Sequence, residues 1–417
     1  MARYETRSWP ANPLAAGGRA ERRAFGYRAF VPDRIAELQL ALPSSVAAAV
    51  STAERAVDAL NRDPPRLASL EVLARRLLRA ESVASSRIEG LVLSQRRLAR
   101  AEAEQADTRD ETARSVLGNV IAMEHAIRLG AGAKRLRLKD VLEIHRRLML
   151  ATTTPQSAGE LRDRQNWIGG NAYNPGRADF VPPPPEYVRG LMDDLVAFIN
   201  RTDLSPLVQA AIAHAQFETI HPFADGNGRV GRALIHVVLR RRGLALDYVP
   251  PVSLILAADA RAYVGGLTAF REERASDWIL LFAQAIERAA AKASELVIRL
   301  AELQEKWRER AGRPRRHSSA EALIVELPAY PIVTVATAQK FLGRSKQAVN
   351  EAVGALAEKG VLHAITLAKR NRAWEAGELF DLIDDVERDL ATPIDDHEPS
   401  RPSPRRKTSK RIQGTVR

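Results

Sequence analysis

Hydrophobic residues recur every three to four positions along most of the chain, which is the spacing of helices with one buried face. In the stretch 67–89, for example, leucines stand at positions 70, 73, 77 and 78, and Gly90 follows as a stop signal. The same spacing predicts further helices over residues 35–60, 111–129, 138–150, 186–200, 206–220, 229–242, 260–274 and 278–309. We therefore expect a body made almost entirely of helices.

Two stretches interrupt this helical pattern. Residues 162–185 are rich in glycine, asparagine and proline, which predicts a loop or short hairpin. Residues 310–317 hold four arginines, a glycine and a proline, which indicates a linker. After the linker, three short helices and an alternating hairpin stretch are predicted over residues 320–327, 335–341, 346–359 and 361–376. This order is typical of a winged helix-turn-helix, and we call residues 317–385 the winged unit.

The formal net charge of the 417 residues is +12, from 63 Lys+Arg against 51 Asp+Glu, which raises nucleic acid as a partner. Seven of the basic residues and no acidic one lie in residues 401–417, which leaves +5 for residues 1–400. A segment of this composition is expected to be a disordered basic tail. It would serve either as a nucleic-acid arm or as a solubilising end.

Composition also excludes several classes of function. The chain has no cysteine, so disulfides, thiolate zinc sites and a cysteine nucleophile are excluded, and a cytoplasmic location is expected. Residues 1–18 are polar and broken by two prolines, so no signal peptide is predicted. No apolar run reaches the roughly 18 residues that a membrane helix needs, so no membrane contact is expected.

The segment His221–Arg232 carries the strongest chemical signal, because it joins two predicted helices through a tight loop suited to phosphates. Gly226 and Gly228 let the backbone approach a ligand closely. The unpaired N–H groups and the dipole at the start of the second helix favour anions. Arg229 and Arg232 lie three residues apart and therefore share that end of the helix.

The same segment also holds candidates for metal binding and proton transfer. Asp225 offers a hard oxygen ligand for Mg²⁺, and His221 can exchange a proton near neutral pH. Together with the phosphate cradle, these groups predict nucleotidyl or phosphoryl transfer. The alternative is a glycine-rich connector whose arginines pair with surface acids.

At every fixed position the segment resembles the signature of the Fic family, His-x-Phe-x-Asp/Glu-Gly-Asn-Gly-Arg-x-x-Arg. Residues 159–170 and 180–185 resemble the family's target-docking flap and the segment after it. Ser85–Gly90 resembles the family's inhibitory motif, Ser/Thr-x-x-x-Glu-Gly/Asn. The resemblance covers about residues 25–380.

This resemblance implies an all-α fold, namely a Fic-type helical bundle with a β-hairpin flap, followed by the small C-terminal winged unit. The domains expected from it are an N-terminal helical region with the inhibitory motif over residues 1–105, a catalytic core over 106–290, a helix and linker over 291–316, the winged unit over 317–385 and the basic tail over 386–417.

Fic enzymes transfer AMP from ATP to a hydroxyl group of a target protein. The resemblance therefore implies ATP and Mg²⁺ as small-molecule partners, and a target with a Ser, Thr or Tyr hydroxyl. Within the loop, the resemblance implies a general base at His221, a loop anchor at Phe223 and a Mg²⁺ ligand at Asp225. It implies an anion cradle at Gly226, Asn227 and Gly228, and phosphate binding by Arg229 and Arg232. The implied flap, at about residues 166–180, holds the target as an added strand and includes Trp167, Ile168, Gly169 and Gly170.

The donor molecule is less firmly indicated. Doc-type kinases of the family carry lysine where this chain has Gly228, which favours AMP transfer over phosphate transfer. A phosphocholine-transferring variant shares much of the loop, so the donor remains open.

Glu89 is, by the same resemblance, the inhibitory glutamate. It is expected to form a two-pronged ion pair with Arg232 and to leave ATP in an unproductive pose. Ser85 stands four residues before it, as the motif requires. The alternative is a capping box from Ser86 to Glu89 that opens a helix. Relatives with this glutamate can also use it to remove AMP from a target, so reversal is a candidate second activity.

Tyr263, Arg261 and four histidines are further candidates. Tyr263 and Arg261 resemble positions that close the family's adenine pocket, and the alternative is an ordinary core tyrosine. The histidines without a second ligand at metal spacing are expected to be structural: His125, His145, His214 and His236.

The winged unit leaves two functions in competition. Its third helix begins with residues that suit base recognition: Ser345, Lys346, Gln347 and Asn350. The alternative is a winged fold for dimerisation or target docking, because the same helix carries acidic residues. The chain is thus expected to be an autoinhibited protein adenylyltransferase. The competing hypothesis is a DNA-binding transcriptional regulator with a vestigial Fic core. A homodimer is a further expectation, because the family often forms dimers.

Overall fold

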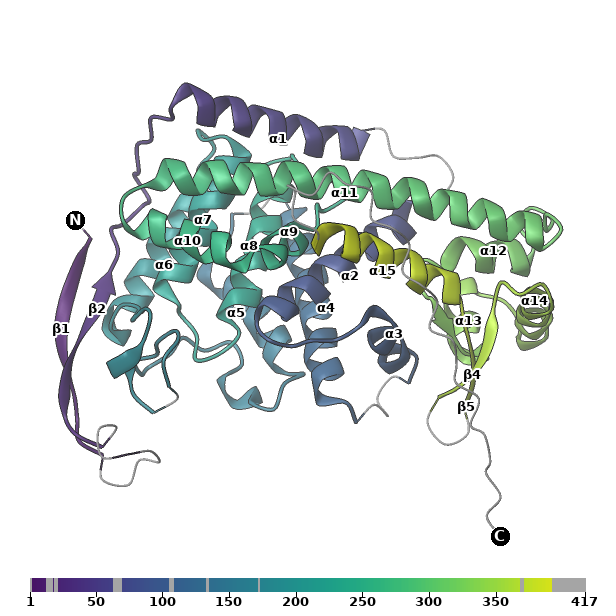
Figure 1. Ribbon diagram of the computed structural model, residues 1–417, viewed down its shortest axis with the longest axis horizontal. Coiled ribbons are helices and arrows are strands. Elements are labelled where there is room, and N and C mark those ends of the chain that lie inside the picture. Colours follow the sequence, from purple (N-terminus) through teal and green to yellow (C-terminus); the bar gives the residue numbers. More distant parts are fainter. Residues whose placement is uncertain are drawn as a thin grey trace, which may run out of the picture.

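A computed structural model describes residues 2–12, 18, 22–62, 70–104, 109–132, 135–171, 173–367 and 371–391. Figure 1 shows a helical body between two small sheets, one at each end of the molecule. The body contains the helices α1 (Ser44–Arg62), α2 (Leu70–Ile88), α3 (Gln95–Glu104), α4 (Glu111–Gly130), α5 (Leu138–Met149), α6 (Pro185–Ile199), α7 (Pro206–Ile220), α8 (Asn227–Arg241), α9 (Val252–Ala258), α10 (Ala260–Arg271) and α11 (Ala275–Arg310).

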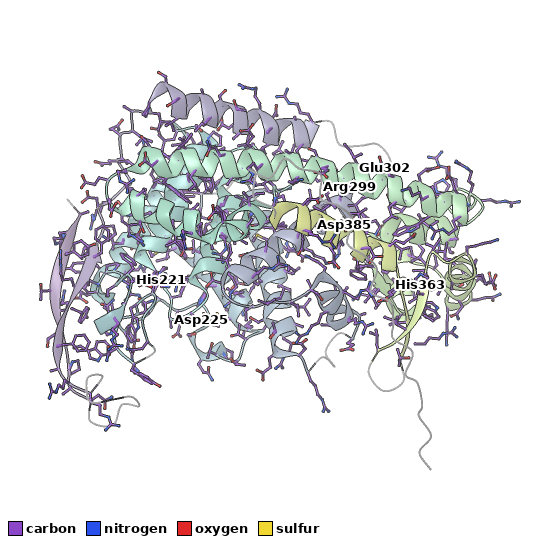
Figure 2. The ribbon with its side chains drawn as sticks, in the orientation of Figure 1. His221, Asp225, Arg299, Glu302, His363 and Asp385 are labelled. Atoms are coloured by element: carbon purple, nitrogen blue, oxygen red, sulfur yellow. The ribbon has the colours of Figure 1, made fainter. Side chains whose placement is uncertain are left out.

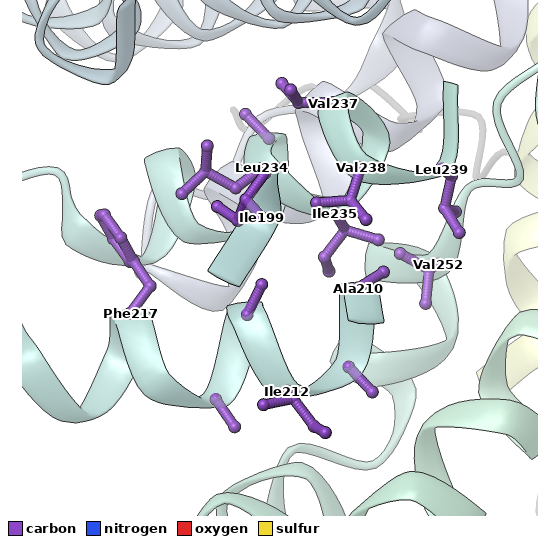
Figure 3. Packing of buried hydrophobic residues seen from close by; sticks show 14 of the residues in the cluster. Ile199, Ala210, Ile212, Phe217, Leu234, Ile235, Val237, Val238, Leu239 and Val252 are labelled. Atoms are coloured by element: carbon purple, nitrogen blue, oxygen red, sulfur yellow. The ribbon is translucent and has the colours of Figure 1, made fainter. Parts of the chain in front are cut away.

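Helices α7 and α8 form the centre of the body. Ser205 caps α7 by accepting a hydrogen bond from Val208 N, and every residue from Leu207 to Ile220 is buried. A helix that is apolar on all sides belongs in a core surrounded by other helices. Figure 3 shows side chains of α7, including Ile212 and Phe217, in the same cluster as Leu234 and Ile235 of α8. The loop between these two helices is therefore held by a rigid pair.

The 36-residue helix α11 connects the body to the C-terminal unit. In Figure 1 it runs beside α1 and reaches α12. Its N-terminal half packs into the main core, and its C-terminal half, up to Trp307, packs into a second core. That second core also contains Leu73 and Leu77 of α2. The winged unit therefore shares a core with the body.

The winged unit has the expected order of elements. It contains α12 (Ser319–Glu326), β3 (Ile332–Val333), α13 (Val335–Leu342), α14 (Lys346–Glu358), β4 (His363–Leu367) and β5 (Asn371–Glu375). The strands form an antiparallel sheet in the order β3-β5-β4, with Ile332 opposite Glu375 and His363 opposite the same residue. A further helix, α15 (Gly377–Ala391), was not predicted and runs past residue 385.

The predominantly helical fold class is confirmed, but several elements differ from the sequence-based expectation. The stretch predicted as helix from residue 35 becomes helical only at Ser44, because Pro43 disfavours helix before it. A hairpin of β1 (Arg3–Trp9) and β2 (Phe25–Val31) was not predicted, nor were α3, α9 and β3. Of the basic tail expected over residues 386–417, residues 386–391 belong to α15, and residues 392–417, which include the basic run 401–417, lie outside the described residues.

In the described part of the chain, no single helix has both the length and the apolar character of a membrane span. One pair, α9 and α10, passes the same test jointly, and it is bent by 102°.

Candidate active site

His221 ends α7 and turns the chain into the loop. Its backbone is left-handed, with φ of 48°, and its N–H donates to the carbonyl of Phe217 at 2.9 Å. This conformation is uncommon outside glycine and asparagine, so the surroundings must hold it. Gly226, with φ of 78°, then starts α8. Figure 2 labels His221 and Asp225 close to each other in the helical body.

Two polar side chains before α6 hold the His221 backbone. Arg162 Nε donates to the His221 carbonyl at 2.8 Å, and Asn166 Nδ2 donates to it at 3.2 Å. Asn166 also donates to the Phe223 carbonyl at 2.9 Å. Arg162 is 7% exposed and donates to the Pro183 carbonyl as well. These contacts fix the turn, and neither residue was assigned such a role from the sequence.

The His221 imidazole is neutral at physiological pH. Burial lowers its pKa to about 4, although the nearby Glu89 carboxylate acts in the opposite direction. Its Nδ1 is buried and has no hydrogen-bond partner among the described residues, and the closest carboxylate oxygen, Glu218 Oε2, lies 3.9 Å away. A neutral imidazole can accept a proton, which is the state that a general base requires.

Phe223, which the resemblance implies as the loop anchor, packs inside the molecule. Its side chain is fully buried and its ring stacks on His145, with ring centres 3.7 Å apart and planes within 7°. Asn227 closes the loop by accepting from Phe223 N and donating to Phe223 O, both at 2.8 Å. The side chain of Asn227 is thus occupied by the loop backbone. Only its N–H remains for the anion cradle that the sequence suggested.

His145 of α5 contacts the loop, although the sequence predicted only a structural histidine. Its Nδ1 accepts from Gly159 N at 3.0 Å, and its Nε2 lies 3.1 Å from the Asp225 carbonyl. These partners assign the proton to Nε2. Burial lowers the pKa of His145 to about 4, so the ring stays neutral. It is a structural histidine that shapes the site directly.

Arg229 and Arg232 both lie at the start of α8 and are almost fully buried, at 4% and 1% exposure. Arg229 Nη1 donates to Ser115 Oγ of α4 at 3.0 Å, and its Nη2 lies 3.7 Å from Asp225 Oδ1. Its Nε is buried without a hydrogen-bond partner in the described part of the chain. Burial lowers the pKa of Arg229. A buried guanidinium with spare donors can receive an anion.

Arg232 is held by Ser85 and Glu89, the two residues that resemble the inhibitory motif. Its Nε donates to Ser85 Oγ at 2.9 Å, and its Nη2 donates to the Ser85 carbonyl at 2.8 Å and to Glu89 Oε1 at 2.7 Å. The ion pair is therefore one-pronged, and the two-pronged pair expected from the sequence was wrong. The reason is that Ser85 already occupies the Nε side of the guanidinium.

Glu89 lies directly over the glycine of the cradle. A Cβ at Gly228 would stand only 2.0 Å from Glu89 Oε1, so the carboxylate occupies space that a side chain there would need. Although burial acts to raise the pKa of Glu89, the Arg232 charge outweighs it and the pKa is lowered. Glu89 is thus ionised and fills the position where the helix terminus favours an anion.

The capping-box alternative for Glu89 was wrong. Helix α2 ends at Ile88, and no helix opens at Ser86. Ser86 Oγ instead donates to the Ser82 carbonyl at 2.9 Å and accepts from Asn119 Nδ2 at 3.1 Å. The next helix begins at Gln95. Glu89 therefore follows a helix end.

Asp225 is the exposed member of the site, with 59% of its side chain accessible. Its Oδ1 accepts from Gly226 N at 2.6 Å, which leaves Oδ2 for a ligand. No group of three or more His, Asp or Glu side chains suited to a metal occurs among the described residues. One free carboxylate beside an anion site suits Mg²⁺, which commonly binds through one or two carboxylates and substrate phosphates.

The flap is a short hairpin between α5 and α6. Ile168 pairs with Phe180, and Trp167 Nε1 donates to the Asn171 carbonyl at 2.7 Å. Gly169 and Gly170 have positive φ, and a Cβ at Gly170 would stand 2.6 Å from the Arg177 carbonyl. Only glycine fits this turn.

A cleft of about 440 Å³ separates the flap from the catalytic loop, and its lining includes Asn166, Trp167 and Ala224. On the outer side, the N-terminal hairpin supports the flap. The Trp9 and Trp167 rings meet edge to face at 5.4 Å.

The remaining candidates have structural surroundings. Tyr263 is 4% exposed, and its hydroxyl lies 2.8 Å from His214 Nε2, which matches the core-tyrosine alternative. His236 Nε2 lies 3.0 Å from Glu81 Oε1, and Glu81 also binds Ser253 of α9. The two histidines are structural, as expected.

In the winged unit, Ser345 caps α14 by accepting from Ala348 N at 3.3 Å. Lys346, Gln347 and Asn350 are exposed. The hairpin predicted over residues 361–376 carries the basic stretch 369–372, part of which lies outside the described residues, because these omit 368–370.

Two family models match the chain. One, described as "Fic/DOC family", matches residues 135–239, and the other, described as "Fic/DOC family N-terminal", matches residues 47–128. The first range contains His221, Asp225, Arg229 and Arg232, and the second contains Ser85 and Glu89.

Similar proteins include two curated relatives and one solved structure. Protein adenylyltransferase fic-1 of Caenorhabditis briggsae is 34% identical over 153 residues, which are 34% of this chain and 27% of the relative. Protein adenylyltransferase Fic of Drosophila virilis is 35% identical over 138 residues, which are 32% and 26% of the two chains. The match thus spans about a quarter of these relatives. A Fic family protein from Desulfovibrio desulfuricans G20 has a similar fold, with a TM-score of 0.51, 21% identity, and coverage of 81% of this chain and 97% of that chain.

Proposed function

Because the chain belongs to the Fic/DOC family, we propose that it is a protein adenylyltransferase that moves AMP from ATP to a hydroxyl group of a target protein. The observation that carries the proposal is the grouping at the start of α8. A neutral, partly buried imidazole, two buried arginines and an exposed carboxylate lie around one helix N-terminus.

His221 takes the proton in the proposed reaction. The target hydroxyl gives its proton to the His221 ring, its oxygen bonds to the α-phosphorus, and the bond to the β-phosphate oxygen breaks. Pyrophosphate leaves with that electron pair. The lowered pKa of about 4 supports this role, because the imidazole is unprotonated at neutral pH. The fixed turn supports it too, since Arg162 and Asn166 prevent the ring from drifting.

The phosphates of ATP would lie at the N-terminus of α8. Arg229 and Arg232 would neutralise the β- and γ-phosphates, and the N–H groups of residues 227 and 228 would donate to them. Asp225 would hold Mg²⁺, which when bound screens the charge of the phosphate oxygens. The burial of both arginines strengthens each contact, because little water competes.

The target would bind at the cleft beside the flap. An extended segment can add to the Ile168–Phe180 bridge as a further strand, which would place its hydroxyl near His221. We also propose a cytoplasmic location, where ATP is available and a chain without cysteine needs no oxidising compartment.

We further propose that the described state is inhibited. Glu89 holds Arg232 and lies over Gly228, where phosphate oxygens would otherwise bind. Release of Glu89 is then required before ATP can bind in a productive pose. This explains why an ionised glutamate is placed against an arginine of the phosphate site.

The test is incubation with Mg²⁺ and ATP labelled at the α-phosphate, in parallel with ATP labelled at the γ-phosphate. The Glu89→Gly chain should label itself or a lysate protein from the α-label only. His221→Ala in the same background should abolish labelling. His125→Ala, a histidine of α4 outside the loop, serves as the matched control and should retain it.

Two outcomes would overturn the proposal. Label from the γ-phosphate would identify a kinase. No label at all, together with a salt-dependent shift of DNA, would favour the competing regulator, whose candidate surface is the exposed side of α14.

A further inference from the structure

We infer that α15 sets the position of the inhibitory glutamate, with Glu387 of α15 and Arg87 of α2 acting as positioning residues for Glu89. The inference rests on the proposed function, and it adds α15, the helix that follows the sheet of the winged unit, to the control of the site. It follows from the way in which α2 contacts both the catalytic body and the winged unit.

One side of α2 is fixed to the catalytic body. Glu81 is fully buried, lies 3.0 Å from His236 of α8 and accepts from Ser253 N of α9 at 2.8 Å. One turn later, Ser85 binds Arg232. These contacts hold α2 beside α8 up to Ser85, but Glu89 comes after the last helical residue.

Helix α2 also packs against the winged unit, through residues that lie nearer its N-terminus. Leu73 and Leu77 lie in the second core together with Phe380 of α15 and Val333 of β3. Arg79 donates to the Ala329 carbonyl, which precedes β3, and to Glu102. Helix α2 therefore cannot shift without disturbing the packing of the winged unit.

The last turn of α2 is tied to α15 by charge. Arg87 Nη2 donates to Glu387 Oε2 at 2.7 Å, and Gln95 Nε2 donates to Glu387 Oε1 at 3.3 Å. Glu387 thus joins residues on both sides of the Glu89 segment. In Figure 1, α15 overlaps α2 near α9, and α15 packs against α3, α9 and α11.

A buried arginine, Arg76, also attracts Glu387 electrostatically. Arg76 is 2% exposed, and its Nε and Nη2 have no hydrogen-bond partner in the described part of the chain. Glu387, Glu102 and Asp384 supply the negative charges that act on it. Removing α15 would leave this cation with fewer compensating charges.

The end of a helix frays when no contact holds its last turn, and this applies to the last turn of α2. Arg87 stands two residues before Glu89 and one before the end of α2. With Glu387 in place, the last turn presents Glu89 to Arg232. Without it, the turn opens more often and Arg232 becomes available to phosphate.

The test measures labelling from α-labelled ATP in the full chain. Glu387→Gln should raise labelling about two- to fivefold, the equilibrium shift that loss of a partly exposed ion pair gives. The exchanged pair Arg87→Glu/Glu387→Arg should return it toward the wild-type level. Asp385→Asn, which breaks only the exposed pair with Arg388 on the same helix, is the control and should change nothing.

Two further measurements separate positioning from a general loss of stability. Adding Glu387→Gln to Glu89→Gly should give no further rise, since the glutamate being positioned is gone. Amide hydrogen exchange over residues 83–91 should be faster in Glu387→Gln than in Asp385→Asn.

The inference is wrong if Glu89→Gly raises labelling while Glu387→Gln does not, or if the two effects multiply. If Glu89→Gly does not raise labelling, the proposed function has failed, and hydrogen exchange alone then tests the positioning role of Glu387. Unchanged exchange over residues 83–91 would overturn the inference, and faster exchange would support it.

Discussion

Under the proposed function, the contact between Glu89 and Arg232 determines how far removal of Glu89 should raise label transfer. The perturbation is Glu89→Gly, which removes one charged hydrogen bond of 2.7 Å. Hydrogen bonds to charged groups contribute about 1.5 to 3 kcal/mol. If that free energy is what a productively bound γ-phosphate must overcome, the transfer rate should rise roughly ten- to hundredfold.

The same substitution should have a modest effect on stability. Arg232 keeps two hydrogen bonds to Ser85, and 34% of the Glu89 side chain is exposed, so solvent already screens part of the pair. We expect a loss of about 1 to 2 kcal/mol in the free energy of unfolding. ATP with Mg²⁺ should recover about 2.7 kcal/mol at a hundred times its dissociation constant, because it binds only the folded chain.

The assay combines label transfer with urea unfolding of the same preparation. Glu89→Gln is the graded control, because its amide oxygen can still accept from Arg232 without the charge. Its labelling should lie between those of the wild type and Glu89→Gly. A folded Glu89→Gly chain whose labelling stays within about twofold of wild type would refute the reasoning, since a lost charged contact should exceed that change.

Three further predictions follow from the same contacts. The pKa values of four histidines are lowered by burial, so the unfolded chain binds more protons than the folded chain below pH 6.5: His125, His145, His214 and His221. Burial raises the pKa of Glu218 to about 7, so this group acts in the opposite sense. Urea unfolding should show the free energy of unfolding falling from pH 6.5 toward pH 4.5, by about 1.4 kcal/mol per pH unit for each net proton that the unfolded chain binds in excess. Asn227→Ala should lower label transfer at least tenfold in a chain of unchanged helicity, because both hydrogen bonds to Phe223 are lost; equal rates would show that the loop closes without them. Arg76→Met should leave the melting temperature equal or higher, because it removes from the interior a guanidinium whose Nε and Nη2 have no hydrogen-bond partner among the described residues. A clear decrease would show that its charge is needed against α15.

The sequence predicted those parts of the site that lie close together along the chain. His221, Asp225, Arg229 and Arg232 stand within twelve residues, so their spacing alone brings them to one helix end. The residues that hold the loop in place could not be predicted in this way. His145, Arg162 and Asn166 reach the loop from 55 to 80 residues away, and nothing in their local sequence marks the contact. Such contacts depend on how helices pack, which periodicity does not report.

Helix α2 shows the same limit within a single element. Its leucine spacing correctly predicted a helix with a buried face. Periodicity reports only that apolar face, whereas α2 also buries Arg76, Arg79, Glu81 and Ser85. A helix polar at so many buried positions is packed on more than one side. Strand β1 of the N-terminal hairpin was missed for a related reason, since its less exposed positions are Glu5, Arg7 and Trp9, two of them charged, and they give no apolar alternation.

Burial also changes what the net charge means. The charge of +12 first indicated nucleic acid, yet five arginines in the described residues are buried: Arg76, Arg79, Arg162, Arg229 and Arg232. The buried carboxylates are fewer, namely Glu81, Glu218 and Glu375, and the raised pKa of Glu218 keeps much of it uncharged. The surface of the described residues is therefore less basic than the sequence total suggests. An electrostatic argument for nucleic acid then rests on residues 401–417 and on α14, whereas the five buried arginines lie inside the molecule and add little to its surface charge.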